Sequence, residues 1–356
     1  MRIGIYDPYL DDLGGGEKYM IAIGICLAKD HRVTVFWDNK EDLEKLKERF
    51  LLDLSSINLA KNIFSSKFGF LKRILETRKY DAIIVLSDGS IPFSLSKKLF
   101  IHIQQPLGEF PINSFKSRIK LSRINAFFCN SQFTKSFIDK GYNVKSLVIY
   151  PPVEIFRKEV KKENIILHVG RFRVKNVKTE DYKKQSFMIE MFKRMVKNGL
   201  KNWSFVLAVS VSEKDREIFN ALPEKTEGFP IKFLINHDNR KLWDIYNRSK
   251  IYWHASGFGE DLTKNPEYAE HFGISTVEAM GAGCVPVVIN AGGQKEIITD
   301  GENGYLWNSI EELKKKTIEL AKNERKLNIL SIAAKKRAEY FAGERFCREL
   351  KEIILE

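Results

Sequence analysis

Short apolar runs rich in β-branched residues alternate along this chain with longer amphipathic stretches, and this alternation restricts the fold more than any single motif. In the first half the short runs predict strands at 2–6, 32–36, 81–86, 99–103, 126–129 and 146–149. The stretches between them have helical periodicity and predict helices at 17–29, 40–50, 68–78 and 131–140. Near-continuous apolar strands separated by helices are typical of a parallel sheet covered on both faces. The pattern therefore predicts an α/β fold with a doubly wound sheet.

Two adjacent prolines, Pro151 and Pro152, interrupt the alternation, because neither continues a strand or a helix. A second series of strands is then predicted at 165–169, 205–209, 232–235, 251–253 and 285–289. A chain of 356 residues is long enough for two domains. We therefore predict one α/β domain at 1–155 and a second at 156–340. Ligands of such domains bind at the carboxyl ends of the strands.

The chain is basic, with 59 Lys and Arg against 46 Asp and Glu, a net charge of +13 that attracts polyanions. The excess is divided almost evenly between the two halves, and no nucleic-acid motif is present, so a nucleic-acid partner is not expected. The four cysteines are far apart and form no CxxC pair, which predicts neither a zinc site nor a disulfide framework. Without a recognisable signal peptide or a long apolar segment, the sequence favours a cytoplasmic protein.

Three motifs follow predicted strands. Gly14, Gly15 and Gly16 precede the first helix, where a glycine turn either lets a phosphate approach the backbone or is simply flexible. The triplet matches neither the dinucleotide nor the P-loop fingerprint. Arg171 ends the first strand of the second half, and Lys183 with Lys184 opens the next helix. On charge alone, this second motif is better explained as a solvated basic loop.

The third motif is the most informative: Glu270 and Glu278 are separated by seven residues, with Gly273 and a predicted helix start between them. Ser275 and Glu278 have the spacing of a capping box, which is a purely structural explanation. Alternatively, the helix start presents backbone N–H groups to a diphosphate, and the two carboxylates accept hydrogen bonds from sugar or ribose hydroxyls.

Taken in order, these motifs resemble the retaining glycosyltransferases of family 4, which have the two-domain GT-B fold. The resemblance covers nearly the whole chain and is carried by residues 14–17, 130–131, 151–153, 170–171, 183, 270–278, 281–288, 292–298 and 300–306. It implies two Rossmann-like domains that face each other across a cleft. It also implies that a C-terminal helix at 341–356 returns to the first domain.

The resemblance also implies a role for each motif residue. Arg171 and Lys183 grip the donor diphosphate, although Lys184 remains an alternative to Lys183. Glu270 holds hydroxyls of the transferred sugar, and Glu278 holds the ribose. The remaining donor contacts are expected from Phe272, Gly273, Ile274 and Ser275 in the second domain, and from Gly15 and Gly16 in the first.

Three further side chains are weaker candidates. His254 follows another strand of the second half and either anchors its loop or contacts sugar or phosphate. His102 and Gln104 lie where many relatives carry an acceptor-side histidine two residues before a proline, so neither is assigned firmly. The insertion at 260–269 is a candidate gate for the site.

The implied activity is retaining, metal-independent transfer of a hexose from a nucleotide sugar to a glycan or lipid-linked acceptor, with no cofactor. The residue order Glu270-His271-Phe272-Gly273 favours GDP-mannose as the donor, and a UDP-sugar is the alternative donor. A non-catalytic protein that binds nucleotide sugars or nucleic acid is the remaining, less favoured hypothesis.

A basic amphipathic segment at 61–80 and a second basic run at Lys116, Arg118, Lys120 and Arg123 suggest an anionic membrane surface as a further partner. For 68–78, however, an ordinary surface helix with its apolar face in the core is slightly favoured.

Overall fold

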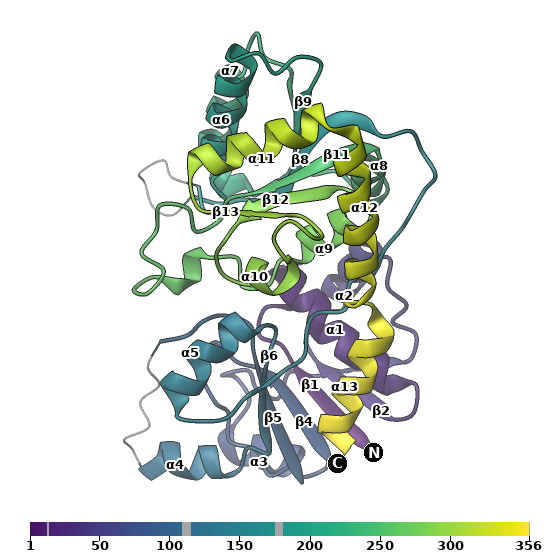
Figure 1. The fold of residues 1–356 in the computed structure, drawn as a ribbon. Coiled ribbons are helices and arrows are strands. Elements are labelled where there is room, and N and C mark those ends of the chain that lie inside the picture. Colours follow the sequence, from purple (N-terminus) through teal and green to yellow (C-terminus); the bar gives the residue numbers. More distant parts are fainter. Residues whose placement is uncertain (13, 109–114, 175–180, 356) are drawn as a thin grey trace. The chain divides into compact units, whose positions relative to one another are not determined.

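The computed structural model describes residues 1–12, 14–108, 115–174 and 181–355. It divides the chain into two compact units (Figure 1). Unit 1 comprises Met1–Pro152 and Gly343–Glu356, and unit 2 comprises Val153–Ala342. Each unit contains one parallel sheet with helices packed on it, so the predicted α/β class is confirmed. None of the helices in the described ranges is both long and apolar enough to span a lipid bilayer.

Unit 1 contains a seven-stranded sheet in the order β3-β2-β1-β4-β5-β6-β7, and all neighbouring strands are parallel. The strands are β1 (Arg2–Tyr6), β2 (Arg32–Phe36), β3 (Ile57–Ala60), β4 (Ala82–Leu86), β5 (Lys98–Ile103), β6 (Ala126–Cys129) and β7 (Leu147–Val148). The helices are α1 (Gly15–Ala28), α2 (Lys40–Phe50), α3 (Phe70–Thr77), α4 (Phe115–Ser122), α5 (Gln132–Tyr142) and α13 (Gly343–Leu355), with a 3-10 turn at Leu10–Asp12.

Two local predictions in unit 1 need correction. The edge strand β3 was not expected, because its four residues are only half-buried and include the polar Asn58. Helix α5 begins after Ser131, whose hydroxyl accepts the N–H of Thr134, as the sequence predicts for an N-cap. It does not stop before Gly141, however, but runs on to Tyr142 and ends at Asn143, which takes the left-handed conformation that closes many helices.

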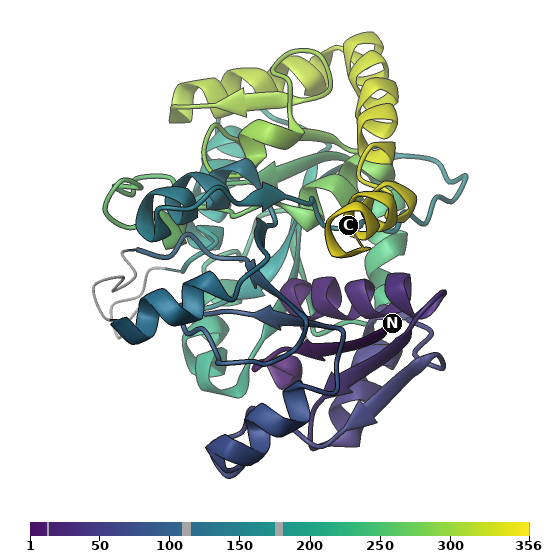
Figure 2. The same ribbon diagram turned by 90° about the horizontal axis from the view of Figure 1, so that it is seen from below.

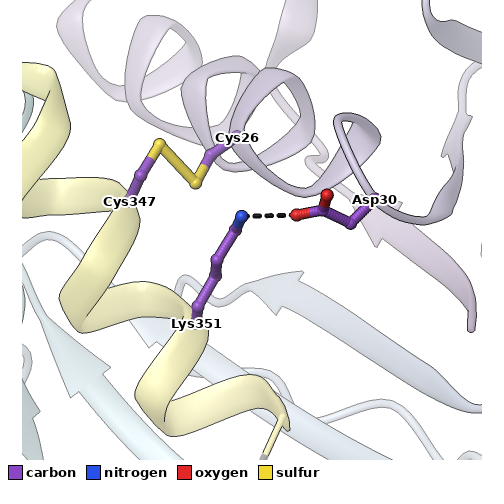
Figure 3. The surroundings of a disulfide bond; sticks show 4 residues. All are labelled: Cys26, Asp30, Cys347 and Lys351. Atoms are coloured by element: carbon purple, nitrogen blue, oxygen red, sulfur yellow. Dashed lines mark hydrogen bonds and ion pairs between the residues drawn. A yellow bond between two sulfur atoms is a disulfide. The ribbon is translucent and has the colours of Figure 1, made fainter.

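Helix α13 belongs to unit 1 although it follows unit 2 in the sequence, and both ribbon views show it alongside α1 (Figures 1 and 2). Phe346, Leu350 and Ile354 bury its apolar face in the core of unit 1. A disulfide joins Cys26 of α1 to Cys347, and Lys351 contacts Asp30 at 2.5 Å (Figure 3). The expectation that the cysteines do not pair is therefore wrong for these two. Because the two cysteines are 321 positions apart, their spacing does not predict a pair, although the fold brings their Cα atoms within 5.6 Å of each other.

Unit 2 contains a six-stranded parallel sheet in the order β10-β9-β8-β11-β12-β13. The strands are β8 (Glu163–Phe172), β9 (Ser204–Val211), β10 (Ile231–Ile235), β11 (Ser249–His254), β12 (Val285–Ile289) and β13 (Tyr305–Trp307), of which β13 was not predicted. The helices are α6 (Gln185–Lys197), α7 (Arg216–Glu224), α8 (Asn239–Arg248), α9 (Ile274–Gly281), α10 (Gln294–Ile297), α11 (Ile310–Lys322) and α12 (Glu324–Glu339). Two short 3-10 turns lie at Glu213–Asp215 and Pro266–Tyr268.

The core and the parallel strands of unit 2 place its polar residues at one edge of the sheet. Large aromatic side chains such as Phe192, Phe205 and Trp253 fill the space between the sheet and its helices. Because all six strands run the same way, β8, β11 and β12 end at one edge of the sheet. Arg171 and His254 lie at that edge, within the last residues of β8 and β11.

Candidate active site

The centre of the candidate site is a carboxylate that binds two donors from different segments. One oxygen of Glu270, Oε2, lies 2.6 Å from Lys183 Nζ and 2.8 Å from His254 Nε2. Lys183 lies just before α6, His254 ends β11, and Glu270 lies in the loop that leads to α9. The sequence placed these three residues in separate motifs, and the fold of unit 2 brings them together.

The contacts of His254 define its role. Its Nδ1 lies 3.4 Å from the backbone N of Ser256, which donates to it, so Nε2 carries the proton donated to Glu270. Burial lowers the pKa of His254, although the neighbouring carboxylate opposes this shift. His254 is therefore a neutral donor that anchors its own loop, which is one of the two interpretations offered by the sequence, and it also orients Glu270. Its contact with sugar or phosphate stays a prediction.

Glu270 is charged. Burial alone would raise its pKa, but the ammonium of Lys183 and the hydrogen bond from His254 outweigh it and hold the pKa well below the usual range. The carboxylate has accepting capacity beyond these two bonds, because each ionised carboxylate offers about four lone-pair positions. It can therefore accept hydrogen bonds from hydroxyl groups of a ligand.

A buried layer lies beneath this cluster. His168 of β8 donates from Nδ1 to the carbonyl of Trp253 at 3.0 Å, and its Nε2 faces the amide of Gln185 at 3.3 Å. Burial lowers the pKa of His168 to about 3, so the ring is neutral. A Cβ on Gly170 would lie 3.1 Å from this ring and 3.5 Å from Lys183 Cγ. The absence of a side chain at Gly170, the residue before Arg171, thus leaves room for Lys183 to extend across the end of the strand.

Asp181 explains why a helix begins beside two lysines. The Asp181 side chain is buried, and it accepts the backbone N–H groups of Gln185 and Ser186 at 2.5 and 3.0 Å. This carboxylate offsets the unfavourable position of Lys183 and Lys184 at a helix N-terminus. It lies just after residues 175–180, which are outside the described residues.

The two adjacent lysines have different partners. Lys184 adopts a left-handed backbone conformation with φ 56°, which turns its side chain toward Glu260, and Nζ lies 2.6 Å from that carboxylate. Lys183 contacts Glu270 instead. Lys184 thus ties the α6 start to the loop at 255–273, and only Lys183 joins the carboxylate cluster.

The start of α9 has no capping side chain, unlike those of α5, α8 and α11. The capping box, which was the structural alternative for this motif, is not formed: Ser275 Oγ lies 2.8 Å from the hydroxyl of Tyr252, and Glu278 accepts a hydrogen bond from Tyr246 at 3.0 Å. Gly273 takes the N-cap position with φ 122°. The first N–H groups of a helix have no intrahelical partners, so this end is suited to an anion.

Glycines support the segment that carries Glu270, a role that the sequence did not reveal. A Cβ on Gly292 would lie 2.2 Å from the carbonyl oxygen of Glu270, and one on Gly293 would lie 2.4 Å from the Cα of Phe272. The N–H of Gly293 donates to the Glu270 carbonyl at 2.7 Å. The turn after β12 therefore holds the backbone of residues 270–272 at a distance that only glycine permits.

Gln294, the residue after this turn, was also missed. Its side chain is fully buried, and neither polar atom has a hydrogen-bond partner among the described residues. The amide nitrogen lies 3.0 Å from the position of a Cβ on Gly273, next to the start of α9. Burying an unpaired amide costs about 1–3 kcal/mol, which makes Gln294 a candidate for ligand contact.

The predicted residues of unit 1 form a group of their own. Gln104 donates from Nε2 to the carbonyl of Gly16 at 3.1 Å, and Asn130 donates to the carbonyl of Gln104 at 3.1 Å. Glu17 accepts the N–H of Gly14 at 2.5 Å, so it caps α1. The contacts expected of Gly15 and Gly16 with donor phosphates stay predictions.

His102 is not available to an acceptor. The ring is fully buried, stacks between Tyr19 and Phe128 with centroid distances of 4.1 and 4.6 Å, and bonds through Nδ1 to the carbonyl of Phe128. The expectation of an acceptor contact at this histidine is therefore wrong. It lies within β5, whose residues from Leu99 to Ile103 are all buried, whereas Gln104 lies beyond the strand end.

Within residues 1–12, 14–108, 115–174 and 181–355, no group of three or more His, Cys, Asp or Glu side chains is arranged to hold a metal ion. The groups that converge on Glu270 are one charged ammonium and one neutral imidazole. The chemistry of this cluster suits hydroxyl groups and a diphosphate.

The family model described as glycosyl transferases group 1 matches residues 153–337, slightly more than half of the chain. The chain belongs to this family. The matched region contains the whole Glu270 cluster and the start of α9.

The curated relatives of this chain include mannosyltransferases. The chain is 23% identical over 275 residues to the GDP-Man:Man(3)GlcNAc(2)-PP-Dol alpha-1,2-mannosyltransferase of Dictyostelium discoideum, with 73% of this chain and 51% of that protein covered. It is 27% identical to an alpha-1,3/1,6-mannosyltransferase of Rhizomucor pusillus, with 52% and 46% covered. The chain thus spans about half the length of these relatives.

Among solved structures, the Anabaena protein HepE in complex with UDP-glucose superposes with a TM-score of 0.72 at 18% identity, covering 99% of this chain and 98% of that one. This similarity extends the shared fold to both units, and the fold class implied by the motifs is confirmed.

Proposed function

We propose that this chain is a retaining glycosyltransferase that moves a hexose from a nucleoside diphosphate sugar to a glycan or lipid-linked acceptor. The observation that carries the proposal is the charged carboxylate of Glu270, held by Lys183 and His254 next to the uncapped start of α9. This arrangement offers acceptors for sugar hydroxyls and donors for a diphosphate within one short region of unit 2.

The proposed chemistry follows from where charge develops. The bond between the anomeric carbon and the diphosphate oxygen breaks, and the leaving nucleoside diphosphate gains negative charge. Lys183, Arg171 and the N–H groups at Gly273, Ile274 and Ser275 stabilise this charge, while Glu270 orients the sugar and Glu278 the ribose. Fixed cations of this kind make a divalent metal unnecessary, so we propose a metal-independent enzyme without a cofactor.

Retention of configuration is proposed to occur by attack on the same face of the sugar. The acceptor oxygen bonds to the anomeric carbon as the diphosphate leaves, and the acceptor proton passes to a donor phosphate oxygen. Retaining hydrolases instead use two carboxylates about 5 Å apart, one of which is a nucleophile. A covalent glycosyl adduct trapped on a carboxylate of this chain would contradict the proposal.

GDP-mannose is the proposed donor. The form Glu270-His271-Phe272-Gly273 favours it, and the names of both mannosyltransferase relatives agree with mannose transfer. A UDP-sugar is the second candidate, supported by the structure of HepE with UDP-glucose. The lipid-linked acceptor and a cytoplasmic location belong to the same proposal.

Thermal unfolding with GDP, UDP and ADP tests the donor. We expect GDP to raise the melting temperature most, with no change when EDTA is added. A rise with UDP alone would replace GDP-mannose by a UDP-sugar. If none of the three nucleotides stabilises the protein, the non-catalytic hypothesis is favoured over an enzyme. Product analysis by NMR, with the anomeric coupling as readout, then tests retention.

A further inference from the structure

Helix α3 presents its apolar side chains to solvent. Phe70, Leu71 and Leu75 are 59%, 76% and 62% exposed, and the one buried residue of the helix is Thr77. The sequence slightly favours a helix whose apolar face lies in the core, and this expectation is wrong. Burial of large apolar side chains is the main stabilising contribution in folding, so three exposed ones on eight residues require an explanation.

The orientation of α3 is fixed by polar contacts on its inner side. Arg73 donates from Nε to the carbonyl of Ile63 at 3.0 Å and from its guanidinium to the carbonyl of Ser65 at 3.1 Å. Thr77 Oγ1 accepts the N–H of Leu95 at 3.0 Å. The helix is therefore attached to unit 1 with its apolar side facing outward.

Two further exposed apolar side chains lie on other segments at this end of unit 1. Leu95, in the turn that contacts Thr77, is 37% exposed, and Ile119 of α4 is 40% exposed. Arg123, just beyond α4, donates to the carbonyl of Ser96 in the same turn at 2.9 Å. Figure 1 shows α3 and α4 at the same end of unit 1. We call Phe70, Leu71, Leu75, Leu95 and Ile119 the apolar surface.

The surroundings of the apolar surface are strongly basic. Segments 61–81, 94–98 and 115–123 together contain twelve Lys and Arg and two acidic residues. Both acids are already paired, Glu76 with Lys79 and Asp81 with Lys97, at 2.7 Å each. The other exposed cations include Lys67, Lys72, Arg78 and Arg118. Lysine and arginine stems lie along apolar material while their charges reach an anionic layer.

We propose that the apolar surface binds an anionic lipid bilayer. Leu71 and Leu75 enter the boundary between headgroups and acyl chains, and the surrounding cations contact lipid phosphates. The short helix protrudes rather than lining a groove, which suits insertion into lipid better than docking of a peptide. This proposal does not rest on the proposed activity, although membrane binding would bring the enzyme to a lipid-linked acceptor.

Vesicle co-sedimentation of the full chain tests the proposal. Vesicles of phosphatidylcholine alone are compared with equimolar phosphatidylcholine and phosphatidylglycerol, at low and moderate salt. We expect binding to the mixed vesicles to be at least about tenfold tighter than to the neutral ones, with partial loss as salt rises. Absence of binding to the mixed vesicles at moderate salt would overturn the proposal.

A matched pair of double variants locates the binding surface. Leu71→Ser with Leu75→Ser removes two exposed leucines and should weaken binding about tenfold. The control, Ile329→Ser with Ile332→Ser, removes two exposed isoleucines of α12, 57% and 69% exposed, and should bind like the wild type. If both variants bind the vesicles equally well, or lose binding equally, the membrane contact lies on another surface and the proposal is overturned. Nucleotide-induced stabilisation, measured on the same proteins, reports on the donor site separately.

Discussion

At the scale of single residues, the structure separates side chains that look equivalent in the sequence. Lys183 and Lys184 are neighbours with the same charge, yet one contacts Glu270 and the other Glu260. The difference comes from the left-handed backbone of Lys184, which no local sequence rule predicts for a lysine. The order of the motifs was enough to predict Glu270 and Lys183 as site residues. Which of the two lysines contacts the same carboxylate as His254 followed only from the fold.

The lysine pair gives a direct test of the site. Lys183→Met should lower kcat by about 10²–10³, or about 3–4 kcal/mol, because the proposed mechanism uses this cation to stabilise the leaving diphosphate. Lys184→Met should keep most of the activity, since it removes the ion pair with Glu260 and leaves the contact between Lys183 and Glu270 in place. Steady-state kinetics on both variants measure the difference. Similar losses in the two variants would show that the loop held by Lys184 matters as much as the cation.

Gln294 offers a second test at this scale. Gln294→Leu removes a buried amide without a partner, so the free protein should be as stable as the wild type or more stable. If the amide contacts the donor, the same variant should lose part of the stabilisation by a nucleotide sugar. Thermal unfolding with and without donor measures both quantities. Lower stability with unchanged donor response would assign Gln294 to packing alone.

At the scale of elements, predictability followed burial. The central strands β1, β2, β4 and β12 were predicted nearly to the residue because their apolar runs are almost continuous. The edge strand β3 was missed because its half-buried residues leave little pattern, and β13 was missed because three residues are too few to show one. Helix α3 shows a different limit of sequence-based prediction. Amphipathic periodicity locates the apolar face of a helix but does not tell whether the core or the solvent lies against it.

The turn after β12 provides a prediction about element packing. Gly293→Ala would bring a Cβ within 2.4 Å of the backbone of Phe272, so the segment bearing Glu270 must shift. We expect a loss of about 1–3 kcal/mol in stability and a weaker donor response. Gly343→Ala is the control, because a Cβ there meets nothing within 4 Å. Denaturant unfolding compares the two, and equal stability would contradict the tight contact.

At the scale of the whole molecule, two buried histidines predict a pH dependence of stability. Burial lowers the pKa values of His102 and His168 to about 3, below the value near 6.5 in an unfolded chain. The unfolded chain therefore binds more protons below pH 6.5, so the stability contributed by each neutral ring is complete above that pH and is lost toward pH 3. At pH 5 the loss is about 2 kcal/mol per histidine.

Denaturant midpoints between pH 5 and 7.5 measure this effect. His168→Gln keeps a polar side chain in place of the ring and should remove the part due to this histidine, about 2 kcal/mol at pH 5. The same change of midpoint with pH in both proteins would contradict a neutral His168 ring.

The return of α13 to unit 1 has a consequence for synthesis of the chain. Residues 153–342 leave the ribosome as a continuous stretch, so unit 2 has all of its sequence while unit 1 still lacks its last helix. The cavity left beside Tyr19 and Cys26 stays open until Phe346, Cys347 and Leu350 have been translated. Truncations that remove residues 343–355 would therefore damage the N-terminal unit of the protein first.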